Sequence, residues 1–141
     1  MTTIRSIDEL LEEARGHIRR VCPASAVAAI RHGALLIDLR PLEYRLRFGE
    51  VPGAIPVSRH VLEWRLDPQS PDRLPVITDH DQAIVLMCSE GYTSSLAARS
   101  LQELGLTGVV DLEGGFRAWQ AAGLPWLSHG ADPEPREREP V

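Results

Sequence analysis

The sequence contains no lysine: all fifteen of its basic residues are arginine. No lysine can therefore act as a base or as a Schiff-base nucleophile in this protein. The 141 residues carry a net charge of −5, which argues against nucleic acid and anionic membranes as partners. No apolar run approaches the length of a membrane span, so we expect no membrane association. The acidic N-terminus lacks the apolar core of a secretory signal, so we expect a cytoplasmic protein.

Cysteine is also scarce, since the chain has only Cys22 and Cys88. Two cysteines are too few for a disulfide scaffold, and neither lies at a CxxC or Cys/His metal spacing. We therefore expect no metal and no cofactor. Nothing in the sequence around Cys22 indicates chemistry, and we interpret it as structural or incidental. Cys88 lies in the most informative stretch of the chain.

Cys88 directly follows a short apolar run, residues 83–87, which is typical of a buried parallel strand. After a six-residue loop, apolar residues recur at helical spacing over 94–104, and Gly105 predicts the end of that helix. Cys88 is thus expected at the carboxyl end of a strand, facing the amino end of a helix. Ligands bind in that crevice of open α/β sheets, and unpaired helix amides favour anions there. A cysteine in this position can be held as the nucleophilic thiolate.

The loop that begins at Cys88 is short and polar enough to form an anion cradle. Its one glycine, Gly91, is free to adopt a positive φ, so backbone amides can wrap around the sulfur. Such a cradle would stabilise a thiolate or a persulfide. Glu90 would repel an anionic substrate, and we expect it to point to solvent or to repel wrong partners. The predicted cradle consists of Ser89, Glu90, Gly91, Tyr92, Thr93 and Ser94.

The rest of the chain alternates predicted helices and strands, which predicts an α/β fold with a mostly parallel sheet. A capping box of Ser6 and Glu9 begins a helix expected over 7–20. Further helical segments are predicted over 24–31, 41–47, 60–67 and 116–122, and strands over 34–39, 55–57 and 109–112.

We divide the chain into an N-terminal helical segment (1–22), a domain (23–128) and a charged, proline-rich tail (129–141) that is predicted to be disordered. Asp38 lies on a predicted buried strand, where a carboxylate needs a partner. Arg40 is the nearest candidate, and we interpret the two as an ion pair that shapes the following loop.

Four segments, in this order, resemble the rhodanese family of sulfurtransferases: LLIDLR (35–40), GEVPGAIPV (49–57), CSEGYTSS (88–95) and VVDLEGGFRAWQAAGLP (109–125). The resemblance implies a sheet of about five mostly parallel strands flanked by helices, to which the N-terminal helix is an addition. It also implies an enzyme in which Cys88 takes a sulfane sulfur from a thiosulfate-like donor or a protein persulfide. The resulting persulfide would pass that sulfur to a thiophilic acceptor.

By position in the same resemblance, Cys88 is the catalytic residue and Asp38 with Arg40 supports the structure. Arg45 and Arg47 are the candidates for holding an anionic donor.

Other functions remain open. Phosphatases and arsenate reductases of this fold need an arginine six residues after the cysteine to bind an oxyanion, and that position is Ser94. A cysteine protease needs a histidine base, yet His60 and His80 lack a recognisable partner. The remaining alternative is a non-catalytic or redox-sensing module that binds a partner and responds through Cys88.

Overall fold

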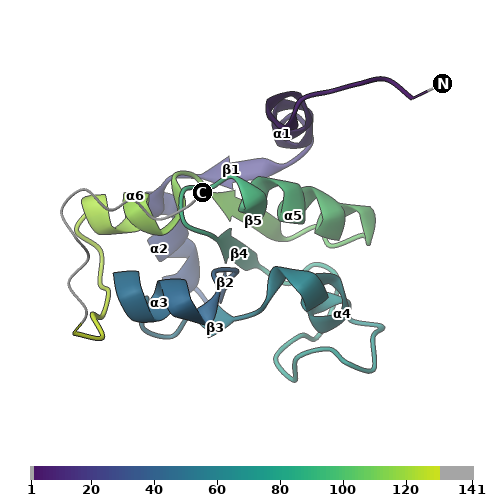
Figure 1. The fold of residues 1–141 in the computed structure, drawn as a ribbon. Coiled ribbons are helices and arrows are strands. Elements are labelled where there is room, and N and C mark those ends of the chain that lie inside the picture. Colours follow the sequence, from purple (N-terminus) through teal and green to yellow (C-terminus); the bar gives the residue numbers. More distant parts are fainter. Residues whose placement is uncertain (1, 131–141) are drawn as a thin grey trace.

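The computed structural model describes residues 2–130 and shows an α/β fold built on a five-stranded sheet (Figure 1). Its strands are β1 (Arg19–Val21), β2 (Leu35–Asp38), β3 (Ile55–Pro56), β4 (Ile84–Met87) and β5 (Val109–Leu112). They lie in the order β1-β5-β4-β2-β3, and all their pairings are parallel. The predicted fold class is therefore confirmed.

Helices cover both faces of the sheet, in Figure 1 on the left (α2, α6) and on the right (α4, α5). The helices are α1 (Ile7–Arg15), α2 (Pro23–Arg31), α3 (Leu42–Phe48), α4 (Leu62–Leu66), α5 (Thr93–Glu103) and α6 (Gly115–Ala121), with a 3-10 turn at Arg59–Val61. On one face, α4 and α5 pack on Ile84 and Leu86 of β4. On the other, α2 and α6 pack on Val85 and Met87. Side chains of a strand alternate between the faces, so β4 is apolar throughout because both its faces are covered.

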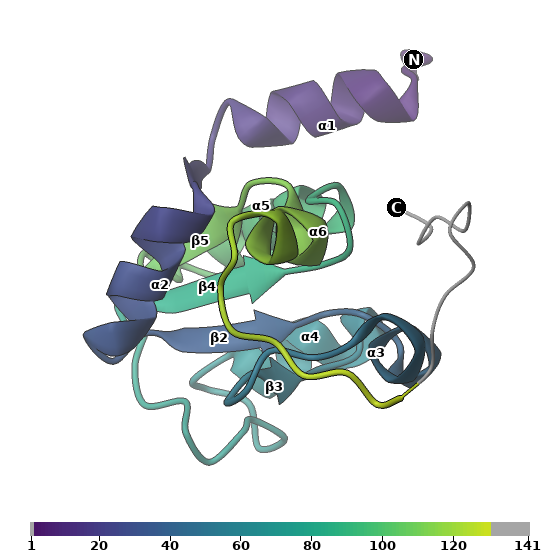
Figure 2. The same ribbon diagram turned by 90° about the vertical axis from the view of Figure 1, so that its left-hand side faces the viewer.

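The N-terminal segment differs from the prediction. The capping box of Ser6 and Glu9 is present, but α1 ends at Arg15, and Arg19 and Arg20, the last residues of the expected helix, lie in β1. Strand β1 pairs with β5 and is thus a strand of the central sheet. Its sequence, Arg-Arg-Val, has no apolar run to mark a strand, and only pairing with a distant segment defines it. Figure 2 shows α1 along the top of the molecule, where it contacts α5.

The other predicted elements lie within a few residues of their expected positions. At the carboxyl end of the described chain, Leu127 forms an antiparallel bridge with Glu50, and their backbone amides and carbonyls are joined at 2.9 and 2.7 Å. Most of the predicted tail, residues 131–141, lies outside the described residues. No helix in the described part of the chain has both the length and the apolar character needed to cross a membrane.

Candidate functional site

Cys88 follows the last residue of β4, the central strand of the sheet, and α5 begins five residues later at Thr93. The cysteine side chain shares the apolar cluster of Ile84 and Leu86, on the face that α5 covers. It is only 2% exposed. The strand, loop and helix predicted around Cys88 are thus present, and the sulfur lies inside the fold at the carboxyl edge of the sheet.

The loop after Cys88 is docked on the amino end of α6. The amide of Phe116 donates to the carbonyl of Cys88 at 2.8 Å, and the amide of Arg117 donates to the carbonyl of Ser89 at 3.2 Å. This approach requires a residue without a side chain at Gly115, which has a φ of +58°. A Cβ at that position would lie 2.4 Å from the carbonyl oxygen of Cys88. Gly115, the first residue of α6, therefore fixes where the cysteine loop lies.

A buried polar network connects Cys88 to β5. The Sγ of Cys88 lies 3.2 Å from the Oγ of Ser94, and that hydroxyl donates to Oδ1 of Asp111 at 2.5 Å. The hydroxyl of Ser95 donates to Oδ2 of the same carboxylate at 2.5 Å. A carboxylate oxygen accepts, so the single hydroxyl proton of Ser94 is directed at Asp111, and Ser94 accepts from Sγ of Cys88. Ser94 therefore links the sulfur of Cys88 to the buried carboxylate of Asp111.

Asp111 is a site residue that sequence reasoning missed. Its carboxylate is fully buried between the two serines, which are also fully buried. The sequence around Asp111 did carry a signal. Asp111 lies within an apolar strand, Val-Val-Asp-Leu, and a carboxylate in such a strand needs a partner, as for Asp38.

Two arginines from the N-terminal segment also reach the cysteine loop, and both were missed. Arg20 donates through Nε to Oδ2 of Asp111 at 2.9 Å and makes a longer contact of 3.4 Å with the carbonyl of Gly91. Arg15 donates to the same carbonyl at 2.8 Å and to the hydroxyl of Ser95 at 3.1 Å. The Arg15 guanidinium also lies 5.8 Å from the ring centre of Tyr92. These contacts join α1 and β1 to the loop.

Glu90 does not point to solvent as expected. Its side chain is 16% exposed and lies 3.5 Å from the guanidinium of Arg117, on the first turn of α6. The negative charge of the loop is therefore opposed by a cation from the helix on which the loop is docked.

Asp38 and Arg40 form a buried ion pair at the carboxyl end of β2, each side chain being 1% exposed. Arg40 donates through Nε and Nη2 to the two carboxylate oxygens, at 3.1 and 2.9 Å. It also donates to the carbonyl of Gly49 at 2.8 Å, and its guanidinium lies 3.9 Å from the ring centre of Phe116. The pair thus ties β2 to the start of the 49–57 segment and to α6.

Arg45 and Arg47, the two candidates for substrate binding, lie in different surroundings. Arg45 lines a cavity of about 360 Å³ at the carboxyl ends of β2 and β3. Another wall residue, Leu39, bonds through its amide to the carbonyl of Met87, next to Cys88. Arg45 also donates to Glu50 at 2.8 Å, which holds the pKa of that carboxyl below its usual value. Arg47 is not among the lining residues and lies 5.8 Å from the ring centre of Phe48.

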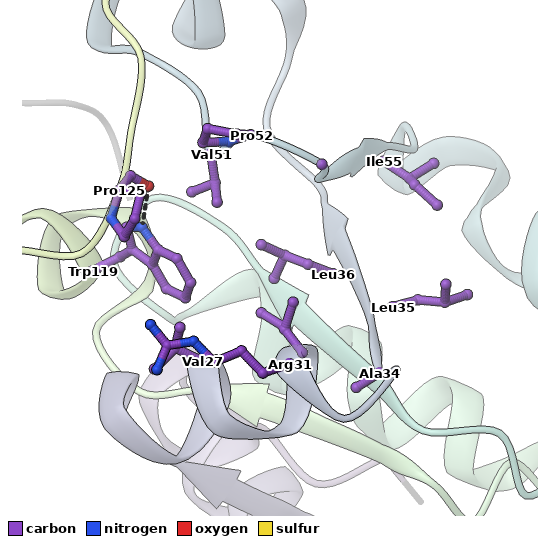
Figure 3. A pocket seen from close by; sticks show the side chains of 12 residues that line it. Val27, Arg31, Ala34, Leu35, Leu36, Val51, Pro52, Ile55, Trp119 and Pro125 are labelled. Atoms are coloured by element: carbon purple, nitrogen blue, oxygen red, sulfur yellow. Dashed lines mark hydrogen bonds between the residues drawn. The ribbon is translucent and has the colours of Figure 1, made fainter.

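A second cavity, of about 320 Å³, is lined neither by Cys88 nor by any residue of its loop; Figure 3 shows its lining residues. Apolar side chains of α2, the start of β2 and the 51–55 turn enclose it, together with Trp119, whose indole donates to the carbonyl of Pro125. Arg31 is its one charged wall residue. Because its walls carry no nucleophile, we assign no chemistry to this cavity.

Cys22 is exposed at the N-cap of α2, and a hydrogen bond with Ser25 lowers its pKa. Cys22 follows β1 and Cys88 follows β4, and both strands pair with β5, which lies between them. The register of these pairings places the two cysteines at the same edge of the sheet. At about 4.8 Å per strand, their Cα atoms are about 10 Å apart, beyond the reach of a disulfide. Both cysteines are free. Among residues 2–130, no group of three or more His, Cys, Asp or Glu side chains is arranged to hold a metal ion.

Comparison with known proteins gives consistent matches. Residues 23–122 match the rhodanese-like domain family. Thiosulfate sulfurtransferase GlpE of Actinobacillus succinogenes is 32% identical over 101 residues, which cover 71% of this chain and 82% of that protein. Thiosulfate sulfurtransferase 16, chloroplastic, of Arabidopsis thaliana is 32% identical over 110 residues, covering 73% and 92%.

Among solved structures, a protein from Rhodopseudomonas palustris superposes with a TM-score of 0.79 at 36% identity, covering 90% of this chain and 98% of that one. It is described as a protein of unknown function and a possible tyrosine phosphatase.

Proposed function

Because this chain belongs to the rhodanese-like domain family, we propose that it is a sulfurtransferase in which Cys88 carries the transferred sulfur. The observation that carries the proposal is the position of Cys88 at the carboxyl end of the central strand, in a short loop between β4 and α5. The relatives named as thiosulfate sulfurtransferases support the same reaction class.

The proposed reaction has two steps. After the Cys88 thiol releases its proton, the thiolate attacks the transferable sulfur of the donor, and the bond that joins this sulfur to the rest of the donor breaks, a sulfur–sulfur bond in thiosulfate or a persulfide and a carbon–sulfur bond in mercaptopyruvate. With thiosulfate, the products are sulfite and a persulfide anion on Cys88. A thiolate acceptor then attacks the outer sulfur of the persulfide, which transfers that sulfur and regenerates the Cys88 thiolate. The backbone amides of residues 89–94 are proposed to stabilise the anionic forms.

The donor is proposed to be a small sulfane-sulfur compound or a persulfide-bearing protein. Arg45 supports the binding of an anionic donor because it lines a cavity next to the strand that carries Cys88. Arg45 is paired with the carboxylate of Glu50, which offsets part of the positive charge of Arg45. The cavity therefore favours donors that also contact other residues of its wall.

Phosphatase activity is the second candidate, because the similar protein from Rhodopseudomonas palustris is described as a possible tyrosine phosphatase. The site does not favour it here. The position that a phosphatase fills with an arginine is Ser94, whose fully buried hydroxyl donates to Asp111. Arg15 and Arg20 each direct Nη2 at the carbonyl of Gly91, a backbone acceptor of the loop.

Mass spectrometry of the intact protein tests the proposal. The Cys22→Ser variant, incubated with thiosulfate, mercaptopyruvate or a protein persulfide, is expected to gain one sulfur atom, and the Cys22→Ser/Cys88→Ser variant is expected to gain none. Failure of all three donors would exclude sulfur transfer. Hydrolysis of para-nitrophenyl phosphate that depends on Cys88 would instead support the phosphatase. Reversible oxidation of Cys88 without sulfur transfer would support the redox-sensing module.

A further inference from the structure

The N-terminal segment contributes two cations to a loop that has none. Residues 88–93 contain no lysine or arginine, and their one acidic residue, Glu90, is opposed by Arg117. Arg15 and Arg20 both donate to the carbonyl of Gly91 in this loop. Both precede residue 23, where the match to the rhodanese-like domain family begins. The contact is therefore a property of this chain that the family match does not assign.

We propose that Arg15 and Arg20 are positioning residues for Cys88, which hold its loop at Gly91 and neutralise the buried carboxylate of Asp111. The proposal rests on the proposed function, since it concerns the anionic forms of the sulfur that transfer requires. It assigns a role in the active site to α1 and β1.

Asp111 places a buried carboxylate close to the sulfur of Cys88. Asp111 is fully buried, and one hydroxyl joins its carboxylate to the sulfur, which places the charge within about 6 Å of Sγ. A carboxylate at that distance opposes a thiolate or a persulfide anion. Arg20 pairs directly with Asp111 at 2.9 Å, and Arg15 reaches it through the hydroxyl of Ser95. The two cations therefore offset the charge that opposes the reactive form.

The arginines also hold the loop in place at Gly91. The carbonyl of Gly91 accepts from Arg15 at 2.8 Å and is approached by Arg20 at 3.4 Å. Gly91 has a φ of +83°, and a Cβ there would meet the amide nitrogen of Gly114 at 2.9 Å and Nη2 of Arg20 at 3.3 Å. The loop is thus held between β1 and the turn before α6, with no room for a side chain.

The elements packed around Cys88 carry several charged groups. On α4, Glu63 is paired with Arg59, and on α5, Glu103 is paired with Arg99. Further charged groups belong to β1, β2, β5, α1, α6 and the loop itself. They are Arg15, Arg20, Asp38, Arg40, Glu90, Asp111 and Arg117. Asp38 is paired with Arg40, and Glu90 is paired with Arg117. The negative charge of Asp111 is instead offset by an arginine of the N-terminal segment, Arg20.

The test is an ultraviolet titration of the Cys88 thiolate in the Cys22→Ser background, with the spectrum of the variant that also lacks Cys88 subtracted. In Arg20→Gln, we expect the midpoint of ionisation to rise by at least about one pH unit. Arg15→Gln is expected to raise it less, because its link to Asp111 passes through a hydroxyl. Arg31→Gln is the matched control: it removes the same charge at the distant apolar cavity and is expected to leave the midpoint unchanged.

Two further variants separate charge from folding. Arg20→Lys keeps the cation and is expected to keep the midpoint near that of the parent. Arg20→Gln/Asp111→Asn removes both charges and is expected to bring the midpoint back down, although it restores no hydrogen bond. Midpoints of Arg15→Gln and Arg20→Gln that equal that of Arg31→Gln would overturn the proposal, as would a double variant no lower than Arg20→Gln.

This titration needs no sulfur donor, so its outcome is separate from that of the sulfur-transfer test. A shifted midpoint in a protein that accepts sulfur from no donor would refute the proposed function and leave the positioning role standing. An unshifted midpoint in a protein that forms the persulfide would do the reverse.

Discussion

The buried ion pair at the end of β2 allows a quantitative prediction about stability. In Asp38→Ala, the guanidinium of Arg40 loses both carboxylate contacts and remains 1% exposed in its surroundings. Two of its interactions survive, with the carbonyl of Gly49 and with the ring of Phe116. The variant therefore leaves a buried cation that is only partly compensated.

Removing one partner of a buried pair costs about 3–5 kcal/mol, much more than the net value of the pair itself. The surviving carbonyl and ring contacts place Asp38→Ala at the lower end, about 3 kcal/mol. The control is Glu103→Ala, which breaks the surface pair of Arg99 and Glu103, whose carboxylate is 65% exposed. That change is expected to cost about 0.5 kcal/mol or less.

Urea unfolding followed by circular dichroism measures both values as free energies of unfolding at neutral pH. The expected result is a much lower midpoint for Asp38→Ala at an unchanged slope, with Glu103→Ala close to the parent. A loss of about 1 kcal/mol or less for Asp38→Ala would refute the reasoning, since the cation would then have found water or another partner.

The remaining predictions concern the loop and the cavity beside it. Gly115→Ala would place a Cβ 2.4 Å from the carbonyl of Cys88, and we expect persulfide formation to slow by at least about tenfold. Gly123→Ala is its control, because Gly123 also has a positive φ but has open space around it, so equal slowing would contradict the clash. Arg45→Gln is expected to raise the KM for an anionic donor severalfold in steady-state assays. Arg47→Gln, at a position about 160° from Arg45 around the axis of α3, should leave that KM unchanged, and equal effects of the two variants would contradict donor binding at the cavity.

Local patterns predicted those elements whose physical cause is local. The apolar runs that became β2, β4 and β5 are buried on both faces, so their strand character is visible in the residues themselves. Strand β1 was missed because its arginines carry no such pattern and its pairing partner lies about ninety residues away, a separation that periodicity cannot detect. In its place the prediction extended α1 by five residues.

The residues of the candidate site also differ in whether a local sequence pattern could predict them. The position of Cys88 between a strand and a helix could be predicted, because it follows from the neighbouring residues. Arg15 and Arg20 were missed because they reach Gly91 from more than seventy residues away, and no spacing rule connects them. Asp111 lay within reach of sequence reasoning, since a carboxylate in an apolar strand demands a partner. The identity of that partner is a matter of tertiary structure.

The order of strands has a consequence for synthesis on the ribosome. Strand β1 leaves the ribosome before its neighbour in the sheet, β5, and Arg20 meets Asp111 across 91 residues of sequence. Until residue 111 has emerged, a nascent chain carries Cys88 without the buried carboxylate to which Ser94 links it, and before residue 116 it also lacks the α6 amide that binds the Cys88 carbonyl. A chain stalled before β5 therefore holds Cys88 without either of these contacts.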